Sequence, residues 1–159
     1  MFWLMNVTAC SPPPRPALKT GLEGKMLPSF NLLLADSVTT FNTANLPKNK
    51  PIVLFFFSPT CPYCRAQTEE IVKNIQSLKG VEFCILTFAP YSEFKSFYTE
   101  YKLDKYKNII AGVDYANFFP DYFKAQSVPY TVFYNNKKQL KQVMLGKLDE
   151  KEIKALALN

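Results

Sequence analysis

Two of the four cysteines stand three positions apart, in the segment Cys61-Pro62-Tyr63-Cys64. Two thiols at this spacing can exchange a disulfide with the cysteines of another protein. Residues 51–57, just before the pair, form a continuous apolar run, and the residues after it carry apolar side chains at helical spacing. The pair is therefore predicted to lie between a buried strand and the start of a helix.

This predicted position gives the two cysteines different roles. Cys61 would lie at the helix N-terminus, where unpaired backbone N–H groups and the positive end of the helix dipole favour a thiolate. We therefore predict that Cys61 is the attacking sulfur. Pro62 suits the first helical turn, because its missing N–H would be unpaired there anyway. Cys64, one turn further on, is placed to resolve the mixed disulfide that Cys61 forms with a substrate.

Half of a structural zinc site is the other interpretation of a Cys-x-x-Cys segment. The sequence contains no histidine, which excludes His-ligated zinc or haem and Cys-His catalysis. The cysteines left to complete a zinc site are Cys10, near the start of the chain, and Cys84, within an apolar stretch. Cys84 is expected to be a small buried hydrophobic residue. We therefore expect a redox site with no metal and no cofactor.

Length and composition fit one globular domain. The chain has 159 residues, of which 48% are apolar and 20% charged, values close to the globular average. Its net charge of +6 could attract an anionic partner, but the basic residues are spread along the sequence. Because no nucleic-acid reader motif accompanies them, we expect no nucleic-acid partner.

Residues 1–20 are predicted to be a signal and a tether. The uncharged start of the chain ends in Val7-Thr8-Ala9-Cys10, which resembles a bacterial lipobox. This resemblance implies lipidation of Cys10 and a location on the periplasmic side of a bacterial membrane. The proline-rich stretch that follows is expected to form an extended tether. A disordered terminus with a chance cysteine is the alternative.

From residue 21 onward, alternating strand and helix patterns predict a single α/β domain over 21–159. Predicted strands cover 30–34, 38–41, 51–57, 81–88, 109–113, 130–134 and 140–145, and predicted helices cover 64–79, 94–101, 115–125 and 150–158. Pro120 should kink or split its helix. The order predicts an N-terminal β-hairpin and a mixed sheet with helices on both faces, with 51–57 as the central strand.

Several segments together resemble the thioredoxin superfamily, and specifically its TlpA/ResA-like branch, which is grouped with AhpC/TSA-like domains. Residues 24–32 resemble the N-terminal hairpin of that branch, and residues 55–64 resemble its strand and active-site block. Residues 127–133 resemble the loop that carries its cis-proline, and Gly146 falls where the branch has a glycine after the final hairpin. The resemblance implies a thioredoxin fold and thiol–disulfide oxidoreductase activity.

The resemblance also implies roles for residues around the cysteines. Pro129 would be cis and pack beside Cys61, and Val128 would offer backbone hydrogen bonds to the substrate chain. Pro62 and Tyr63, between the cysteines, would join the same substrate-binding surface. The implied partners are cysteine-containing exported proteins, reduced at the expense of an upstream dithiol donor. On the residues alone, an ordinary trans turn at a strand start remains open for Pro129.

Three positions depart from the pattern of the branch. Thr60 replaces the tryptophan that usually precedes the first cysteine, which implies a different partner-docking surface. Phe55 stands where thioredoxin has a buried aspartate, and Gln67 stands where ResA-like proteins have a glutamate. Both changes remove a proton acceptor near Cys64, so we expect its deprotonation to depend on water or on the substrate.

Three other functions compete with this interpretation. A peroxiredoxin-like peroxidase needs a serine or threonine three residues before its cysteine, which Ser58 supplies, but also a proline where Leu54 stands. The distant arginine that such a peroxidase needs is missing too. A glutaredoxin would need a Gly-Gly segment after the proline loop, which is absent. A non-catalytic thioredoxin-fold binding module would not need the intact cysteine pair.

Overall fold

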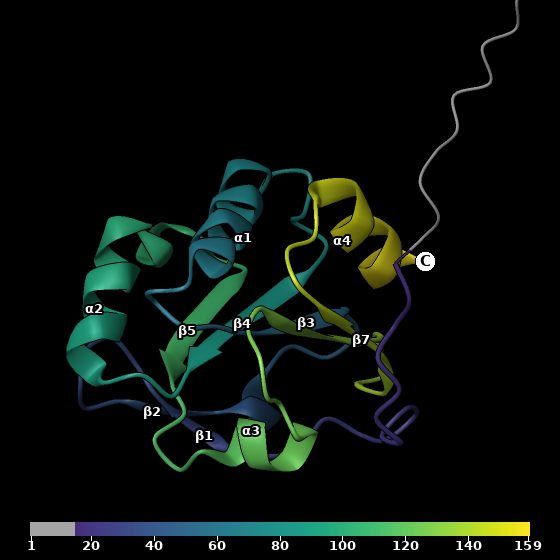
Figure 1. Cartoon of the computed structure of the whole chain (residues 1–159), viewed down its shortest axis with the longest axis horizontal. Helices are drawn as coiled ribbons and strands as arrows, with labels where there is room; N and C mark the ends of the chain where they lie inside the picture. Colours follow the sequence, from purple (N-terminus) through teal and green to yellow (C-terminus); the bar gives the residue numbers. More distant parts are fainter. Residues whose placement is uncertain (1–14) are drawn as a thin grey trace, which may run out of the picture.

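The computed structural model describes residues 15–159, which fold around one seven-stranded sheet with the order β2-β1-β5-β4-β3-β6-β7 (Figure 1). The strands are β1 (Asn31–Leu33), β2 (Thr40–Asn42), β3 (Ile52–Phe56), β4 (Glu82–Thr87), β5 (Ile109–Val113), β6 (Tyr130–Tyr134) and β7 (Leu140–Leu145). Strands β3, β4 and β5 are parallel, and every other pairing is antiparallel. The predicted mixed sheet and its N-terminal hairpin, β1–β2, are confirmed.

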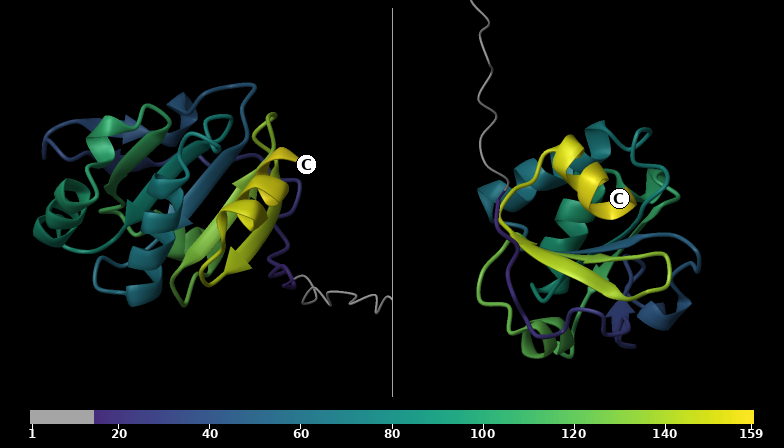
Figure 2. Two further views of the ribbon diagram at one scale, coloured as in Figure 1. Left: turned by 90° about the horizontal axis from the view of Figure 1, so that it is seen from above. Right: turned by 90° about the vertical axis from the view of Figure 1, so that its right-hand side faces the viewer.

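Helices cover both faces of this sheet, as predicted. They are α1 (Pro62–Lys73), α2 (Tyr91–Glu100), α3 (Phe118–Phe123) and α4 (Glu150–Leu158), with short 3-10 turns η1 (Thr43–Asn45) and η2 (Leu103–Lys105). Helices α1, α2 and α4 pack on one face and α3 packs on the other (Figures 1 and 2). Within residues 15–159, none of the helices has the length and apolar character needed to cross a membrane.

Every residue of β3 and β4 is buried, because both faces of these strands are covered. Side chains alternate between the two layers, so that Val53 and Phe55 face α1 while Leu54 and Phe56 face α3. The middle strand of the seven is β4, not β3 as predicted, because the hairpin β1–β2 extends the sheet beyond β5. Strand β3 still leads into the cysteine segment, because only residues 57–60 separate its end from Cys61.

Helix α1 ends at Lys73, six residues before its predicted end. The carbonyl oxygen of Glu70 accepts the helical hydrogen bond from the N–H of Asn74 at 3.2 Å and a second one from the side-chain amide of Asn74 at 2.9 Å. The next N–H, that of Ile75, donates to the carbonyl oxygen of Val72, three residues earlier, at 3.4 Å, so the α-helical pattern ends there. The chain then continues in turns that still bury Ile75 and Leu78. The apolar spacing that predicted a longer helix is therefore satisfied without one.

Helix α3 also differs from its prediction over 115–125. It begins at Phe118, so Pro120 is its third residue and occupies the first turn, where an N–H would have no helical partner. The carboxylate of the buried Asp114 accepts hydrogen bonds from the first two backbone N–H groups of the helix, at 3.1 and 2.7 Å. Pro120 therefore helps to start the helix and does not kink or split it.

The first described residue, Arg15, already contacts the folded domain, six residues before the predicted domain start at residue 21. The backbone N–H of Leu18 donates to the carbonyl oxygen of Val143 in β7 at 2.8 Å. The Arg15 guanidinium donates to the carbonyl oxygens of Leu145 and Lys147 at 3.2 and 2.7 Å. The predicted lipobox and Cys10 lie outside the described residues.

Candidate active site

The cysteine pair lies where β3 leads into α1, and this predicted position is confirmed. Cys61 is the N-cap of α1, with an extended backbone (φ −77°, ψ 119°), and Pro62 is the first helical residue. The N–H of Cys61 donates to the carbonyl oxygen of Ser58 at 3.1 Å, which closes a tight turn before the helix. The Cys61 sulfur is therefore held at the positive end of the helix dipole.

The two thiols differ in accessibility and in acidity. Cys61 is partly exposed, whereas Cys64 lies on the buried face of α1 and is completely buried. Burial raises the pKa of Cys64 to about 12. A hydrogen bond with the Ser58 backbone is the next largest effect and lowers this pKa, while the hydrogen bond with Cys61 raises it by less. At neutral pH, Cys64 is therefore a protonated thiol that a substrate cannot reach, and Cys61 is the sulfur that it can.

The proline loop meets the cysteine end of the sheet. Strand β6 pairs with β3 so that Tyr130 lies opposite Phe56, the last residue of β3. Pro129 is buried and follows a cis peptide bond from Val128, as the family resemblance implied. The Pro129 carbonyl accepts a 2.9 Å hydrogen bond from the N–H of Gly146. Val128 packs against the same apolar cluster as Cys61.

Tyr63 and Pro62 are exposed on the surface beside Cys61. Tyr63 is 68% exposed, so its ring is available to a molecule that approaches Cys61. The structure thus brings the predicted substrate-binding residues to one end of the molecule, around the accessible sulfur. Their contacts with a substrate remain predictions.

Arg65, the residue after Cys64, makes three contacts with other parts of the protein. It forms an ion pair with Glu100 of α2, and its guanidinium lies 5.4 Å from the centre of the Tyr101 ring. A third contact, at 3.2 Å, is donated to the carbonyl oxygen of Pro59 in the active-site loop. Arg65 therefore joins that loop to α2, a role that local sequence could not indicate because Glu100 lies 35 residues away.

Gln67 has a structural role that the sequence did not reveal. Its side chain is buried, and its amide nitrogen donates to the carbonyl oxygen of Leu148 at 3.1 Å. Its amide oxygen accepts from the N–H of the same Leu148 at 2.6 Å. Both the nitrogen and the oxygen of the Gln67 side-chain amide are thus hydrogen-bonded to the backbone of Leu148. Phe55, the second departure that removes an acceptor near Cys64, packs in the apolar cluster that contains Cys64, so neither residue supplies a proton acceptor.

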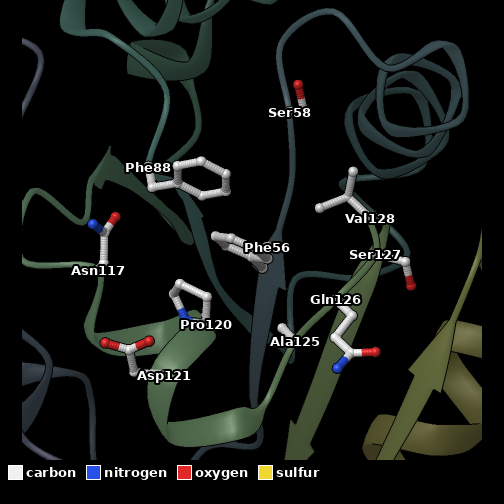
Figure 3. Close-up of a pocket in the computed structure, with 10 residues that line it drawn as sticks. All are labelled: Phe56, Ser58, Phe88, Asn117, Pro120, Asp121, Ala125, Gln126, Ser127 and Val128. Carbon is white, nitrogen blue, oxygen red and sulfur yellow. The ribbon is translucent and has the colours of Figure 1, made fainter.

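A pocket of about 430 Å³ adjoins the cysteine site (Figure 3). Ser58 of the active-site loop and Val128 of the proline loop form part of its lining, and Phe56 and Phe88 form another part. Sequence reasoning missed this pocket, because its lining comes from four separate segments of the chain.

The profile of the Redoxin family matches residues 22–156. No curated protein is a significant sequence match to this chain. Among solved structures, a secreted disulfide oxidoreductase of Mycobacterium tuberculosis, homologous to E. coli DsbE, is similar at 22% identity and a TM-score of 0.66, over 80% of this chain and 93% of that chain.

Two further structures resemble the chain. A pneumococcal exposed lipoprotein thioredoxin from Streptococcus pneumoniae is 21% identical, with a TM-score of 0.61 over 79% of this chain and 95% of that chain. AhpC of Enterococcus faecalis is 12% identical, with a TM-score of 0.68 over 85% of this chain and 90% of that chain. At these identities the likeness shows the fold. Because the family profile covers nearly all of the described domain, the chain belongs to the Redoxin family and is a thiol–disulfide oxidoreductase with a thioredoxin fold.

Proposed function

We propose that the protein is a reductase that transfers two electrons from its cysteine pair to a disulfide of another protein. The Cys61 thiolate attacks one substrate sulfur, and the other substrate sulfur leaves as a thiolate. Cys64 then loses its proton and attacks the Cys61 sulfur. This step releases the second substrate thiol and leaves a Cys61–Cys64 disulfide, which an upstream dithiol donor reduces again.

The observation that carries this proposal is the difference between the two thiols. A partly exposed sulfur at a helix N-terminus suits the first attack, while a buried thiol with a pKa of about 12 cannot compete for the substrate. Cys64 acts only when its partner sulfur is already in the mixed disulfide. Since Gln67 and Phe55 offer no proton acceptor, the Cys64 proton passes to water or to the departing substrate thiolate.

We propose further that the substrates are cysteines of exported proteins and that Cys10 carries a lipid anchor. The support is the lipobox resemblance at residues 7–10, together with a secreted oxidoreductase and an exposed lipoprotein among the structural relatives. Labelling of expressing cells with a palmitate analogue tests the anchor. The label should enter the wild-type protein and be absent from Cys10→Ser, and labelling of neither protein would refute lipidation.

Trapping of the mixed disulfide tests the chemistry. Cys64→Ser keeps the attacking sulfur but cannot resolve, so it should accumulate adducts that a reducing agent releases on a gel, and mass spectrometry then identifies the bound proteins. Cys61→Ser should accumulate none. Cys84→Ala is the matched control, because Cys84 is buried in β4 and should not affect turnover in insulin reduction.

Two results would contradict the proposal. Trapping by Cys61→Ser in place of Cys64→Ser would reverse the two roles. Failure of the wild-type protein to reduce insulin with a dithiol donor would leave a binding module, or, if it consumed peroxide instead, a peroxidase.

A further inference from the structure

The pocket beside the cysteine site has no part in the exchange reaction itself, but part of its lining belongs to the active-site loop and to the proline loop. Ser58 lies three residues before Cys61, and Val128 directly precedes the cis-proline. The remaining lining comes from Phe56 at the end of β3, from Phe88 just after β4, and from α3 with the segments on either side of it. A polypeptide that presents its disulfide to Cys61 between the active-site loop and the proline loop would therefore lie beside this pocket.

The apolar wall of the pocket is built from stacked rings. Phe88 stacks on Phe56 with ring centres 5.5 Å apart, and Phe56 stacks on the buried Phe119 at 4.7 Å. Phe88 is nevertheless 56% exposed. Figure 3 shows Phe88 and Val128 on opposite sides of Phe56. An exposed ring held in place by the core offers fixed apolar area to a second apolar side chain at little cost in conformational entropy.

The charge of the pocket also affects which substrate side chains can bind there. Asp121 is the charged residue of its lining, and within residues 15–159 it forms no ion pair. An acidic side chain that entered the pocket would lose water and face this carboxylate without a neutralising partner. The pocket therefore favours an apolar side chain and opposes an acidic one.

We propose that this pocket binds a large apolar side chain next to the substrate cysteine that Cys61 attacks, and that Phe88 determines this specificity. The inference rests on the proposed function, since it requires Cys61 to be the attacking sulfur. The substrates are then exported polypeptides in which aromatic or aliphatic residues flank a disulfide, and the flanking residue enters the pocket while the cysteine lies at Cys61.

A set of peptides tests the proposal with the reduced full-length protein. Each peptide carries one cysteine as a mixed disulfide with thionitrobenzoate, flanked on both sides by phenylalanine, serine or aspartate. When the Cys61 thiolate attacks the peptide sulfur, thionitrobenzoate leaves with the electron pair of the broken S–S bond and is measured by its absorbance. Cys64 then releases the peptide thiol. The small disulfide DTNB, which has no peptide chain, reports on the cysteine pair alone.

The wild-type protein should react with the phenylalanine peptide about five to ten times faster than with the serine peptide, the ratio expected for partial burial of one ring. The aspartate peptide should be slowest. Phe88→Ala should reduce the phenylalanine-to-serine ratio to about two or below. Asp121→Asn should raise the rate with the aspartate peptide relative to serine. Val38→Ala, which changes an exposed side chain of the hairpin outside the pocket, is the matched control and should keep the wild-type ratios.

The outcomes separate the inference from the function on which it rests. If DTNB and all peptides react through Cys61 but the wild type does not distinguish phenylalanine from serine, the pocket is not a specificity site. A preference that survives in Phe88→Ala would also overturn the assignment of Phe88. If thionitrobenzoate release were the same in Cys61→Ser as in the wild type, the proposed function itself would be wrong.

Discussion

Replacement of Gln67 by alanine should destabilise the domain by several kcal/mol, although the residue touches no substrate. Its buried amide satisfies both the N–H and the carbonyl oxygen of Leu148, at 2.6 and 3.1 Å. Gln67 belongs to α1, and Leu148 lies just before α4. These two hydrogen bonds therefore fasten the cysteine-bearing helix to the segment that leads into the last helix.

The magnitude follows from the groups left without partners. A buried donor or acceptor that loses its hydrogen bond costs about 1–3 kcal/mol. The Gln67→Ala variant leaves the N–H and the carbonyl oxygen of Leu148 without these hydrogen bonds, and Leu148 is completely buried. The free energy of unfolding should therefore fall by about 2–5 kcal/mol, with the lower value expected if water enters the vacated space. A loss of about 3 kcal/mol lowers the urea midpoint by about 1.5 M for an m value of about 2 kcal/mol/M.

Urea denaturation followed by circular dichroism measures this change, with Gln76→Ala as the control. Gln76 is an exposed glutamine in the turns that follow the same helix, and it makes no side-chain hydrogen bond to the described residues. Its replacement should alter the free energy of unfolding by less than about 0.5 kcal/mol. Equal stabilities of the two variants would show that the Leu148 hydrogen bonds contribute nothing beyond a surface position.

Three further outcomes follow from burial and hydrogen bonding. Iodoacetamide should alkylate Cys61 in the native protein near neutral pH and spare Cys64 and Cys84 until urea is added, as read by peptide mass spectrometry; early modification of a buried thiol would contradict the assigned order of attack. Burial raises the pKa of both Cys64 and Cys84 from 9.0 to about 12. As the pH rises above 9, the unfolded state therefore loses these two protons before the folded state does. Each thiol should then lower the free energy of unfolding by up to about 1.4 kcal/mol for every pH unit between pH 9 and 12. The Cys84→Ala variant should show about half of that slope in urea titrations between pH 9 and 10, because above pH 10 tyrosines whose pKa burial also raises, such as Tyr134, add to it. Asp114→Ala removes the cap of α3 and should cost about 1–3 kcal/mol by the same measurement, whereas a loss below about 0.5 kcal/mol would refute its capping role.

The elements that could be predicted from the sequence are those in which local pattern and burial agree. Residues 51–57 and 109–113 are apolar runs bounded by polar residues, and each forms a strand of the parallel centre of the sheet. The start of α1 was predicted to within two residues, because Pro62 suits a first helical turn and apolar residues at helical spacing follow it. Local sequence therefore fixed where the cysteine pair stands.

What the sequence could not provide depends on contacts between distant segments. The end of α1 was misplaced because Ile75 and Leu78 are buried by turns that have the same apolar spacing as a helix. Gln67 was interpreted only as a missing proton acceptor, since its partner Leu148 is 81 positions away. The pocket beside the cysteines was invisible for the same reason.

The contacts of Arg15 place the first described residue at one end of the domain. Its guanidinium donates to the carbonyl oxygens of the residues on either side of Gly146, and the Gly146 N–H donates to the Pro129 carbonyl. Arg15 is therefore held at the same end of the sheet as the cysteine pair. Five residue steps separate Cys10 from Arg15, a span of at most about 18 Å when fully extended. A lipid on Cys10 would thus keep Cys61 close to the membrane surface. The distance of a disulfide from the membrane, as well as the sequence around it, would then determine whether the protein can reduce it.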